Sequence, residues 1–343
     1  MKCFKRAGNI KVGVVGYGGA FDMGKLHLAE MKKAGMTPVA VADTDPARLK
    51  VAAGDFPDIE TYPSMAAMLK KSGVNLITLI TPHNTHARLA LKALRSGRHV
   101  VCEKPLAITT AECDAMIGEA KKNRLVISTY HNRHWDGCIM NALKYIRSGV
   151  IGDVYRIEAH MGAYGKPDNW WRSSKSISGG ILYDWGVHLL EYSFQIIDAD
   201  IVEVAGFAKK GFWAPKTRWK NDTVEDEGLL VVRFAGGPWM TLCITSLDSN
   251  PKPSQLEITG TKGTFTFDYF NWECITHKGR KTAITKGPHP TSEGWRFYQN
   301  LADHLTKGAK LVITPEWSRR PIHVLDLADK SAKQGKALKA KYK

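Results

Sequence analysis

The chain has 343 residues, 43% of them hydrophobic, and a formal net charge of +16. This length favours two domains, and no stretch of the sequence is apolar and long enough to cross a bilayer as a helix. The basic start is not followed by the apolar core of an export signal, and the six cysteines are scattered without paired metal spacing. We therefore expect a cytoplasmic protein with reduced thiols and no membrane partner.

The positive charge is concentrated partly at the end of the chain, where six lysines follow Asp329. Such a run is typical of a solvated tail. The remaining excess could raise the local concentration of an anionic cofactor or substrate. It would also suit nucleic-acid binding, but the sequence holds no recognised nucleic-acid motif, so we expect no such partner.

The first predicted strand covers residues 10–15 and leads into a glycine-rich turn that ends at Gly24. A helix over 25–34 and a strand over 38–42 follow, and the second strand ends at Asp43. This order is typical of a dinucleotide-binding unit, in which the turn and helix N-terminus hold the pyrophosphate and the acid binds ribose hydroxyls. The predicted cofactor contacts of this unit are Gly16, Tyr17, Gly18, Gly19, Ala20, Phe21 and Asp43.

The turn departs from the usual G-x-G-x-x-G spacing, because Phe21 stands where the third small residue belongs. Gly24 can take that part if the loop carries three extra residues. Phe21 or Asp22 would then lie near the cofactor, and we expect the Asp22 carboxylate to point away from the pyrophosphate.

Strands and helices continue to alternate up to about residue 130, which predicts a parallel sheet with helices on both faces. The predicted helices are 46–53, 64–71, 85–96 and 110–123, and the predicted strands are 75–80, 98–102 and 125–129. Polar clusters follow three of these strands, at the sheet edge where such folds bind ligands. These clusters are residues 81–86, 103–105 and 130–134.

The histidine pairs in two of these clusters, His83 with His86 and His131 with His134, could suggest a metal. We expect no metal, because no acid or cysteine completes either set recognisably. Lys104 precedes a proline, and the bond between them could be cis. Beside a substrate hydroxyl, its ammonium would stabilise a developing alkoxide.

From about residue 131 the chain becomes rich in β-structure and tryptophan. Predicted strands cover 154–163, 201–208, 228–234, 239–247, 255–260 and 264–269, and helices cover about 293–307 and 321–338. Turn signals between several strands predict a mainly antiparallel sheet. We therefore expect an α/β protein with a dinucleotide-binding Rossmann domain at 1–130 and a substrate-binding and oligomerisation domain at 131–343, which includes the closing helix and the basic tail.

Within the second domain, Gly179 and Gly180 lead into an apolar run that contains Asp184 and His188. In a helix, this spacing of four puts both side chains on one face. A carboxylate beside an imidazole raises its basicity and orients it, which suits proton transfer at neutral pH.

Taken together, these motifs resemble the Gfo/Idh/MocA family, which contains glucose–fructose oxidoreductase and inositol dehydrogenase. Matching positions run from the strand at Ile10 to the closing helix. Besides Gly16 and Gly18, they are Thr81-Pro82 with His86, Glu103-Lys104-Pro105, Asn132-Arg133, Gly152-Asp153-Val154, Trp171-Arg172, and Gly179-Gly180 with Asp184, Gly186 and His188. The Glu-Lys-Pro and Asp-x-Gly-x-His pieces are the specific ones.

The resemblance implies a nicotinamide cofactor, a sugar or polyol substrate held between the domains, and a homodimer or homotetramer formed through the C-terminal sheet. It implies that His188 takes the hydroxyl proton, that Asp184 orients His188 and that Lys104 polarises the substrate oxygen. Thr81, Pro82, His86, Glu103 and Lys104 join the cofactor site. The substrate site comprises Lys104, Asn132, Arg133, Tyr164, Trp171, Arg172, Asp184 and His188, with Tyr130, Trp135, Asn169, Trp170 and Trp185 as further candidates.

Asp43 favours NAD over NADP, because a carboxylate binds ribose hydroxyls and repels a 2′-phosphate. We therefore predict an NAD-dependent dehydrogenase or reductase acting on CH–OH groups. An alternative is a glycoside hydrolase or lyase that keeps NAD bound and oxidises its sugar transiently. A binding protein without turnover is disfavoured, because it has no need for an Asp184–His188 pair.

Overall fold

The structure is a computed structural model that describes residues 3–342. The chain forms two compact units, one of Met1–Asn132 with Trp295–Arg319 and one of Arg133–Gly294 with Arg320–Lys343. The predicted second domain instead includes residues 295–319. Three residues of the predicted domains, Met1, Lys2 and Lys343, lie outside the described part of the chain.

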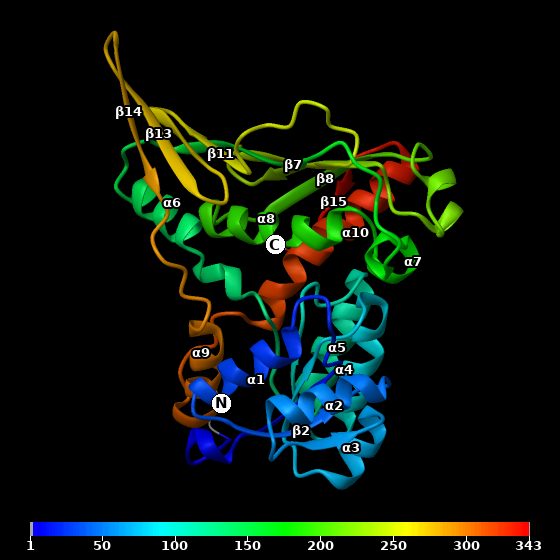
Figure 1. The fold of residues 1–343 in the computed structure, drawn as a ribbon. Helices are drawn as coiled ribbons and strands as arrows, with labels where there is room; N and C mark the ends of the chain where they lie inside the picture. Colours follow the sequence, from blue (N-terminus) through cyan, green and yellow to red (C-terminus); the bar gives the residue numbers. More distant parts are fainter. Residues whose placement is uncertain (1–2, 343) are drawn as a thin grey trace. The chain divides into compact units, whose positions relative to one another are not determined.

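The first unit is built on a parallel sheet, which among residues 3–342 has six strands in the order β3-β2-β1-β4-β5-β6 (Figure 1). The strands are β1 (Lys11–Val15), β2 (Thr37–Ala42), β3 (Glu60–Tyr62), β4 (Leu76–Leu79), β5 (His99–Cys102) and β6 (Ile127–Thr129). The helices between them are α1 (Met23–Lys33), α2 (Pro46–Asp55), α3 (Met65–Lys71), α4 (His86–Arg95) and α5 (Thr110–Lys122). The predicted doubly wound fold is confirmed.

Local sequence explains why these elements begin where they do. The central strands β4 and β5 are buried at every residue, as expected for parallel strands covered on both faces. Asp45 caps α2 by accepting the N–H of Ala47, and Pro46 follows at a position where its missing N–H costs nothing. Thr109 and Glu112 form a reciprocal capping box at the start of α5.

Two glycines fix the turn between β1 and α1. Gly16 has φ +87°, and a Cβ there would lie 2.5 Å from the carbonyl oxygen of Ile80. Gly24 lies inside α1, and a Cβ there would lie 2.6 Å from the Tyr17 carbonyl oxygen. Gly24 therefore provides the close helix–strand packing that the third glycine of the usual motif provides, and the turn carries three extra residues.

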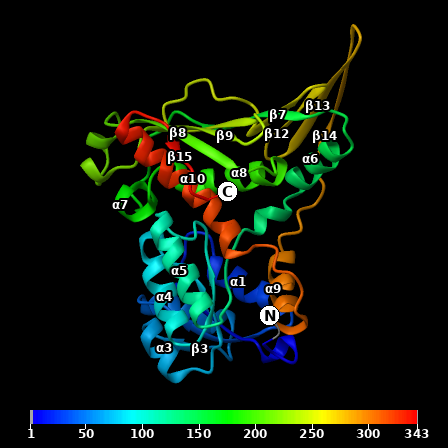
Figure 2. The same cartoon turned by 180° about the vertical axis from the view of Figure 1, so that it is seen from behind.

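The segment that returns to the first unit carries α9 (Arg296–Lys307), which lies beside α1 (Figure 2). Phe297, Tyr298 and Leu301 on α9 are buried. These apolar side chains explain why the segment packs here, although it follows the whole β-rich region in sequence.

The second unit contains a sheet that has nine strands within residues 3–342, in the order β14-β13-β12-β11-β7-β10-β9-β8-β15. Only the β7–β10 pairing is parallel among the described strand pairs of this sheet. The strands are β7 (Val154–Gly162), β8 (Ile201–Lys209), β9 (Glu227–Phe234), β10 (Trp239–Thr245), β11 (Leu256–Gly260), β12 (Gly263–Phe267), β13 (Asn271–Lys278), β14 (Lys281–Pro288) and β15 (Leu338–Lys339). The mainly antiparallel sheet is as predicted.

Helices of this unit lie along one face of that sheet (Figure 1). They are α6 (Gly137–Arg147), α7 (Lys175–Ser178), α8 (Leu182–Ile196) and most of α10 (Pro315–Gln334). Short 3-10 turns complete the structure at Ala7–Asn9, His83–Thr85, Asn132–Trp135, Trp171–Ser173, Ala214–Lys216 and Lys220–Asp222. Among residues 3–342, no helix is long and apolar enough to cross a membrane.

Replacing Gly24 with alanine tests the packing of α1 against the turn. The added methyl has no room beside Tyr17, so we expect the free energy of unfolding to fall by about 1–3 kcal/mol. Gly118→Ala in α5 is the matched control, because a Cβ at Gly118 would meet no described atom within 4 Å. That variant should gain about 0.5–1 kcal/mol through helix propensity. Equal stability of the two variants in a denaturant titration would contradict the packing role of Gly24.

Candidate active site

Asp43 stands directly after β2 and is held by backbone groups on both of its oxygens. Its Oδ2 accepts the N–H of Tyr17 at 2.7 Å, and its Oδ1 accepts the N–H of Asp45 at 2.9 Å. The carboxylate therefore joins the end of the second strand to the glycine turn. Each oxygen keeps a second lone pair, so the pair of oxygens can still accept ribose hydroxyls.

The turn itself has the shape that a pyrophosphate requires. Gly18 has φ +66°, and a Cβ there would meet no described atom within 4 Å, so its backbone is open to a ligand. The Arg48 guanidinium lies over Gly19, where a Cβ would be 2.2 Å from its central carbon. Helix α1 begins just beyond, and the dipole at its N-terminus favours a negative charge. These residues fit a dinucleotide.

The other residues predicted for the turn differ in how they are placed. The Tyr17 side chain is buried, and its hydroxyl donates to Asp55 at 2.9 Å. Burial and the Asp55 carboxylate raise the pKa of Tyr17. Phe21 is 60% exposed, and Asp22 adopts a left-handed conformation that leads into α1.

His86 connects the polar clusters that follow β4 and β5. The buried ring has Nδ1 2.8 Å from the carbonyl oxygen of Pro105 and Nε2 2.8 Å from that of Thr81. Burial lowers the pKa of His86. The bond between Lys104 and Pro105 is cis. His86 thus fixes two of the three predicted clusters to each other, and among residues 3–342 no group of three or more His, Cys, Asp or Glu could hold a metal ion.

Glu103, next to Lys104, lies in a hydrogen-bond network that the sequence analysis missed. One carboxylate oxygen lies 2.9 Å from Nε2 of His27, and the other accepts the N–H of Lys104 at 2.9 Å. Nδ1 of the fully buried His27 lies 2.7 Å from the Tyr298 hydroxyl. The Thr78 hydroxyl lies 3.3 Å from the same Tyr298 hydroxyl and extends the network. Burial opposes ionisation of Glu103, but His27 and Lys104 outweigh it and lower the pKa of the carboxyl.

In the second unit, α8 carries Asp184 and His188 one helical turn apart, so the run that contains them is helical and the condition for a shared face is met. The Asp184 carboxylate forms an ion pair with Arg172. The same guanidinium lies 5.0 Å from the ring centre of Trp170 and 5.1 Å from that of Trp171. The sequence analysis assigns Arg172 to the substrate and Asp184 to His188; the structure adds a direct link between Arg172 and Asp184.

His188 is 4% exposed, and its ring packs edge-on against Trp185 at 5.4 Å. Arg133 lies 4.7 Å from the Trp185 ring centre and pairs with Asp136 at 2.9 Å. Tyr269 packs against Trp185 from a loop after β12. An imidazole, two guanidinium groups and several aromatic faces therefore gather around α8.

The remaining substrate candidates are dispersed. Tyr164 is 59% exposed and packs against Trp213, while Asn132 is half-buried at the first residue of a 3-10 turn. Tyr130 is buried in the first unit, where its hydroxyl donates to Glu30 at 2.6 Å, and Trp135 is buried in the second.

A parallel sheet of this order, with a glycine turn and an acid after the second strand, defines the class of dinucleotide-binding Rossmann proteins. Two family models match the chain: the oxidoreductase family with an NAD-binding Rossmann fold at residues 10–131, and the Gfo/Idh/MocA C-terminal domain at residues 139–266. The chain belongs to the Gfo/Idh/MocA family of oxidoreductases.

Relatives span a range of similarity. The oxidoreductase C115.03 of Schizosaccharomyces pombe is 32% identical over 66% of this chain and 62% of its own length, less than two thirds. The scyllo-inositol 2-dehydrogenase (NADP(+)) IolW of Bacillus subtilis is 21% identical over 98% of both chains. The structure of levoglucosan dehydrogenase in complex with NADH and levoglucosan has a TM-score of 0.82 at 21% identity and covers 97% of this chain and 99% of its own.

The network around Glu103 can be tested by removing His27. His27→Ala leaves the largely buried Glu103 carboxylate, whose side chain is 13% exposed, without its imidazole partner, so we expect the free energy of unfolding to fall by about 3–5 kcal/mol. Tyr298→Phe should lower the free energy of unfolding by about 1 kcal/mol, the usual net contribution of one hydrogen bond. His99→Ala is the control, because buried His99 accepts the N–H of Val126 instead of contacting an acid. A loss for His27→Ala no larger than for His99→Ala in urea unfolding would contradict a special role of the Glu103 network.

Proposed function

We propose that the protein is an NAD-dependent dehydrogenase or reductase that transfers hydride between a nicotinamide and a hydroxyl-bearing carbon of a sugar or polyol. The observation that carries this proposal is α8, which presents Asp184 and His188 one turn apart with Arg172 paired to the acid. Relatives named as inositol and levoglucosan dehydrogenases support the substrate class. The aromatic and guanidinium groups around α8 also suit sugar rings, whose C–H faces pack on aromatics and whose hydroxyls accept charged hydrogen bonds.

In the oxidative direction, the substrate loses a proton from oxygen and a hydride from carbon, and a carbonyl results. When bound, the nicotinamide ring supplies the acceptor for the hydride. We assign the proton to the His188 imidazole, because an imidazole can act as a general base. Lys104 carries the positive charge that stabilises the developing alkoxide. Asp184 stabilises the charged imidazole, and Arg172 holds the Asp184 carboxylate in place.

We assign the substrate contacts to Asn132, Arg133, Tyr164, Trp171 and Arg172, together with the catalytic residues Lys104, Asp184 and His188. Arg172 serves two purposes in this proposal, because its guanidinium has further N–H donors beside the pair with Asp184. The cofactor contacts are Gly16, Tyr17, Gly18, Gly19, Ala20, Phe21, Asp43, Thr81, Pro82, His86, Glu103 and Lys104.

We also propose a homodimer or homotetramer formed through the nine-stranded sheet. Helices lie along one face of this sheet (Figure 1). Large apolar side chains such as Phe207 and Trp239 are 61% and 38% exposed, and exposed apolar residues of this kind can contribute to a protein interface. The six free thiols support a reducing, cytoplasmic compartment.

The direct test follows nicotinamide absorbance in purified protein with NAD or NADP and a panel of sugars, polyols and aryl glycosides. Sustained formation of reduced nicotinamide with a free sugar or polyol supports the dehydrogenase. Release of the aryl group without a net change in nicotinamide would instead support the hydrolase that uses bound NAD.

The catalytic assignment predicts that His188→Ala lowers kcat by about 10²–10⁴-fold, the usual contribution of a general base. Lys104→Ala should have an effect of the same order, because it removes the charge beside the reacting oxygen. NAD affinity of His188→Ala, measured by calorimetry, should stay close to that of the unaltered protein, whereas Lys104→Ala also removes a proposed cofactor contact. Lys71→Ala, an exposed lysine at the end of α3, is the control. Full activity of His188→Ala across the pH range would exclude His188 as the proton acceptor.

The cofactor assignment predicts that Asp43→Ala weakens NAD by about 10- to 100-fold, the equivalent of a charged hydrogen bond of 1.5–3 kcal/mol. The affinity for NADP should fall less or should rise, because the carboxylate no longer repels a 2′-phosphate and the Arg48 guanidinium lies nearby over Gly19. Asp45→Ala is the control for the loss of one acid in this segment. Asp45 is not a proposed cofactor contact, and its carboxylate caps α2 by accepting the N–H of Ala47. An unchanged ratio of the two dissociation constants would show that Asp43 does not contact the ribose.

A further inference from the structure

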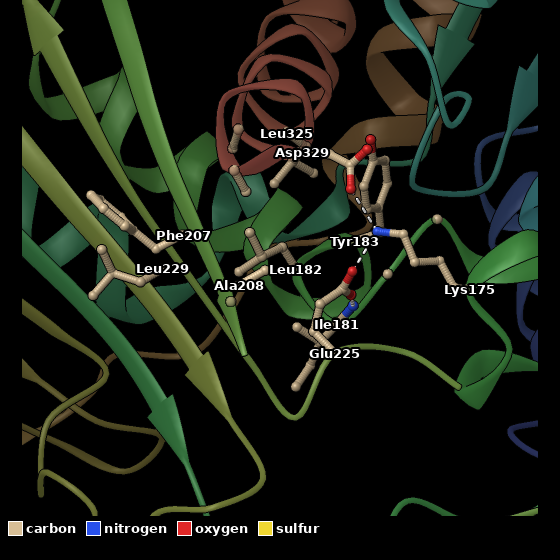
Figure 3. Close-up of a pocket in the computed structure, with 15 residues that line it drawn as sticks. Lys175, Ile181, Leu182, Tyr183, Phe207, Ala208, Glu225, Leu229, Leu325 and Asp329 are labelled. Carbon is tan, nitrogen blue, oxygen red and sulfur yellow. Dashed lines mark hydrogen bonds and ion pairs between the residues drawn. The ribbon is translucent and has the colours of Figure 1, made fainter. Parts of the chain in front are cut away.

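A cluster of charged side chains lies beside the start of α8, within the second unit (Figure 3). Lys175 of α7 donates to Glu225, which precedes β9, and to Asp329 of α10 at 2.7 Å. Lys210 lies 3.2 Å from the same oxygen of Glu225, and Lys333 lies 2.7 Å from the second oxygen of Asp329. Three separate elements thus meet at the Lys175 ammonium.

Glu225 also contacts the backbone of the catalytic helix. Its Oε2 accepts the N–H of Ile181 at 3.1 Å, and Ile181 immediately precedes α8. The first N–H groups of a helix have no partner within the helix, and its N-terminus favours a negative charge. Glu225 therefore acts as an anchor for α8 that is supplied from 44 residues further along the chain.

The two glycines before α8 allow this close approach. Gly180 has φ +134°, and a Cβ there would lie 2.7 Å from Oε2 of Glu225. Gly179 has φ +95°, and a Cβ there would lie 2.9 Å from the ring of Tyr183. The turn fits between the Glu225 carboxylate and the first turn of α8, and a side chain at either position would push them apart.

Electrostatics show that Glu225 and Lys175 depend on each other. Burial of Glu225, which is 5% exposed, would raise the pKa of the carboxyl, but the Lys175 ammonium outweighs it and the pKa is lowered. Burial would likewise lower the pKa of Lys175, but Glu225 and Asp329 raise it. A buried charge is costly unless it is paired, so the position of each group is restricted to where its partner lies.

The cavity beside this cluster has a volume of about 30 Å³. That is room for about two water molecules, at 10–15 Å³ of this measure for each. A sugar or a nicotinamide ring does not fit. The cluster is therefore not a second substrate site, and its contacts lead to the backbone of α8.

We propose that Lys175, Glu225 and Asp329 are positioning residues that fix the start of α8 and thereby set where Asp184 and His188 stand. The inference rests on the proposed function of these two residues. Asp184 lies three residues after Ile181, in the first turn of the helix, so a shift of the anchored backbone moves it directly. Geometry of this kind matters, because a displacement of 1 Å in a catalytic group can cost about 10²-fold in rate.

The test compares Glu225→Ala with Glu225→Gln. The alanine removes both the ion pair and the acceptor for the Ile181 N–H, whereas the glutamine keeps an acceptor of the same length. We expect kcat to fall by about 10- to 100-fold for the alanine, with NAD affinity unchanged, and to recover in part for the glutamine. Glu257→Gln is the control, because it removes a carboxylate that pairs with Arg156 in the same sheet at 3.2 Å.

A readout besides activity separates this proposal from the proposed function. The His188 imidazole resonances, assigned with His188→Gln, should shift in Glu225→Ala and stay in place in Glu257→Gln. Such a shift in a protein that transfers no hydride would support the anchor while overturning the proposed function. A stability loss with unchanged kcat and unchanged His188 resonances would overturn the anchor. If Glu225→Ala does not fold, Glu225→Gln and Lys175→Met are judged by the same criteria.

Lys175→Met adds a pH signature. In the unaltered protein the lowered pKa of Glu225 means that the anchor is complete above the ordinary carboxyl pKa and is lost as pH falls through the lowered value. The raised pKa of Lys175 means that the pair is lost only at high pH. Without Lys175, burial acts on Glu225 against Lys210 alone, while Asp329 keeps Lys333, so Glu225 should be protonated at higher pH than in the unaltered protein. The part of the acid loss of folding stability that comes from its lowered pKa should therefore shrink. An equal acid dependence of the free energy of unfolding in both proteins would contradict the coupling.

Discussion

A carboxylate that accepts a backbone N–H at a fixed place is the interaction on which the candidate functional residues of each unit depend. Asp43 accepts the N–H of Tyr17 in the glycine turn, and Glu103 accepts that of Lys104. Glu225 accepts that of Ile181 at the start of α8. Because a carboxylate taken out of water requires partners, each of these groups determines where a segment that carries functional residues can lie.

Each buried acid has a second partner that holds it from a distant part of the sequence. His27 and Tyr298 support Glu103, and Lys175 with Asp329 supports Glu225. Such a network is costly when one member is removed, since the remaining charge stays buried. Because each charge must meet its partner at hydrogen-bond distance, the network also fixes the orientation of its side chains, which a purely apolar contact does not do. Preorganised charges are what hydride and proton transfer require, because the surroundings need not reorganise during the reaction.

The fold is shared with levoglucosan dehydrogenase at 21% identity. Trp170, Trp171 and Arg172 lie at a short 3-10 turn outside the main strands and helices. Loops of this kind tolerate substitution, while the sheet and helices keep the proposed catalytic groups in place. Substrate choice within this architecture therefore depends on a few contacts, and fold alone does not assign it.

The sequence by itself determined the parallel first sheet and the glycine turn with its acid, because these signals are local in the chain. The spacing of Asp184 and His188 indicated a shared face only on the condition that the run is helical, and the structure supplied that helix as α8. It did not predict β13 and β14, whose exposed residues lack a clear alternation of buried and solvent-facing positions. The pairing of His27 with Tyr298 spans 271 residues and that of Lys175 with Asp329 spans 154. Only the tertiary structure decided these contacts, and with them the return of α9 to the first unit, because packing of distant segments has no local pattern.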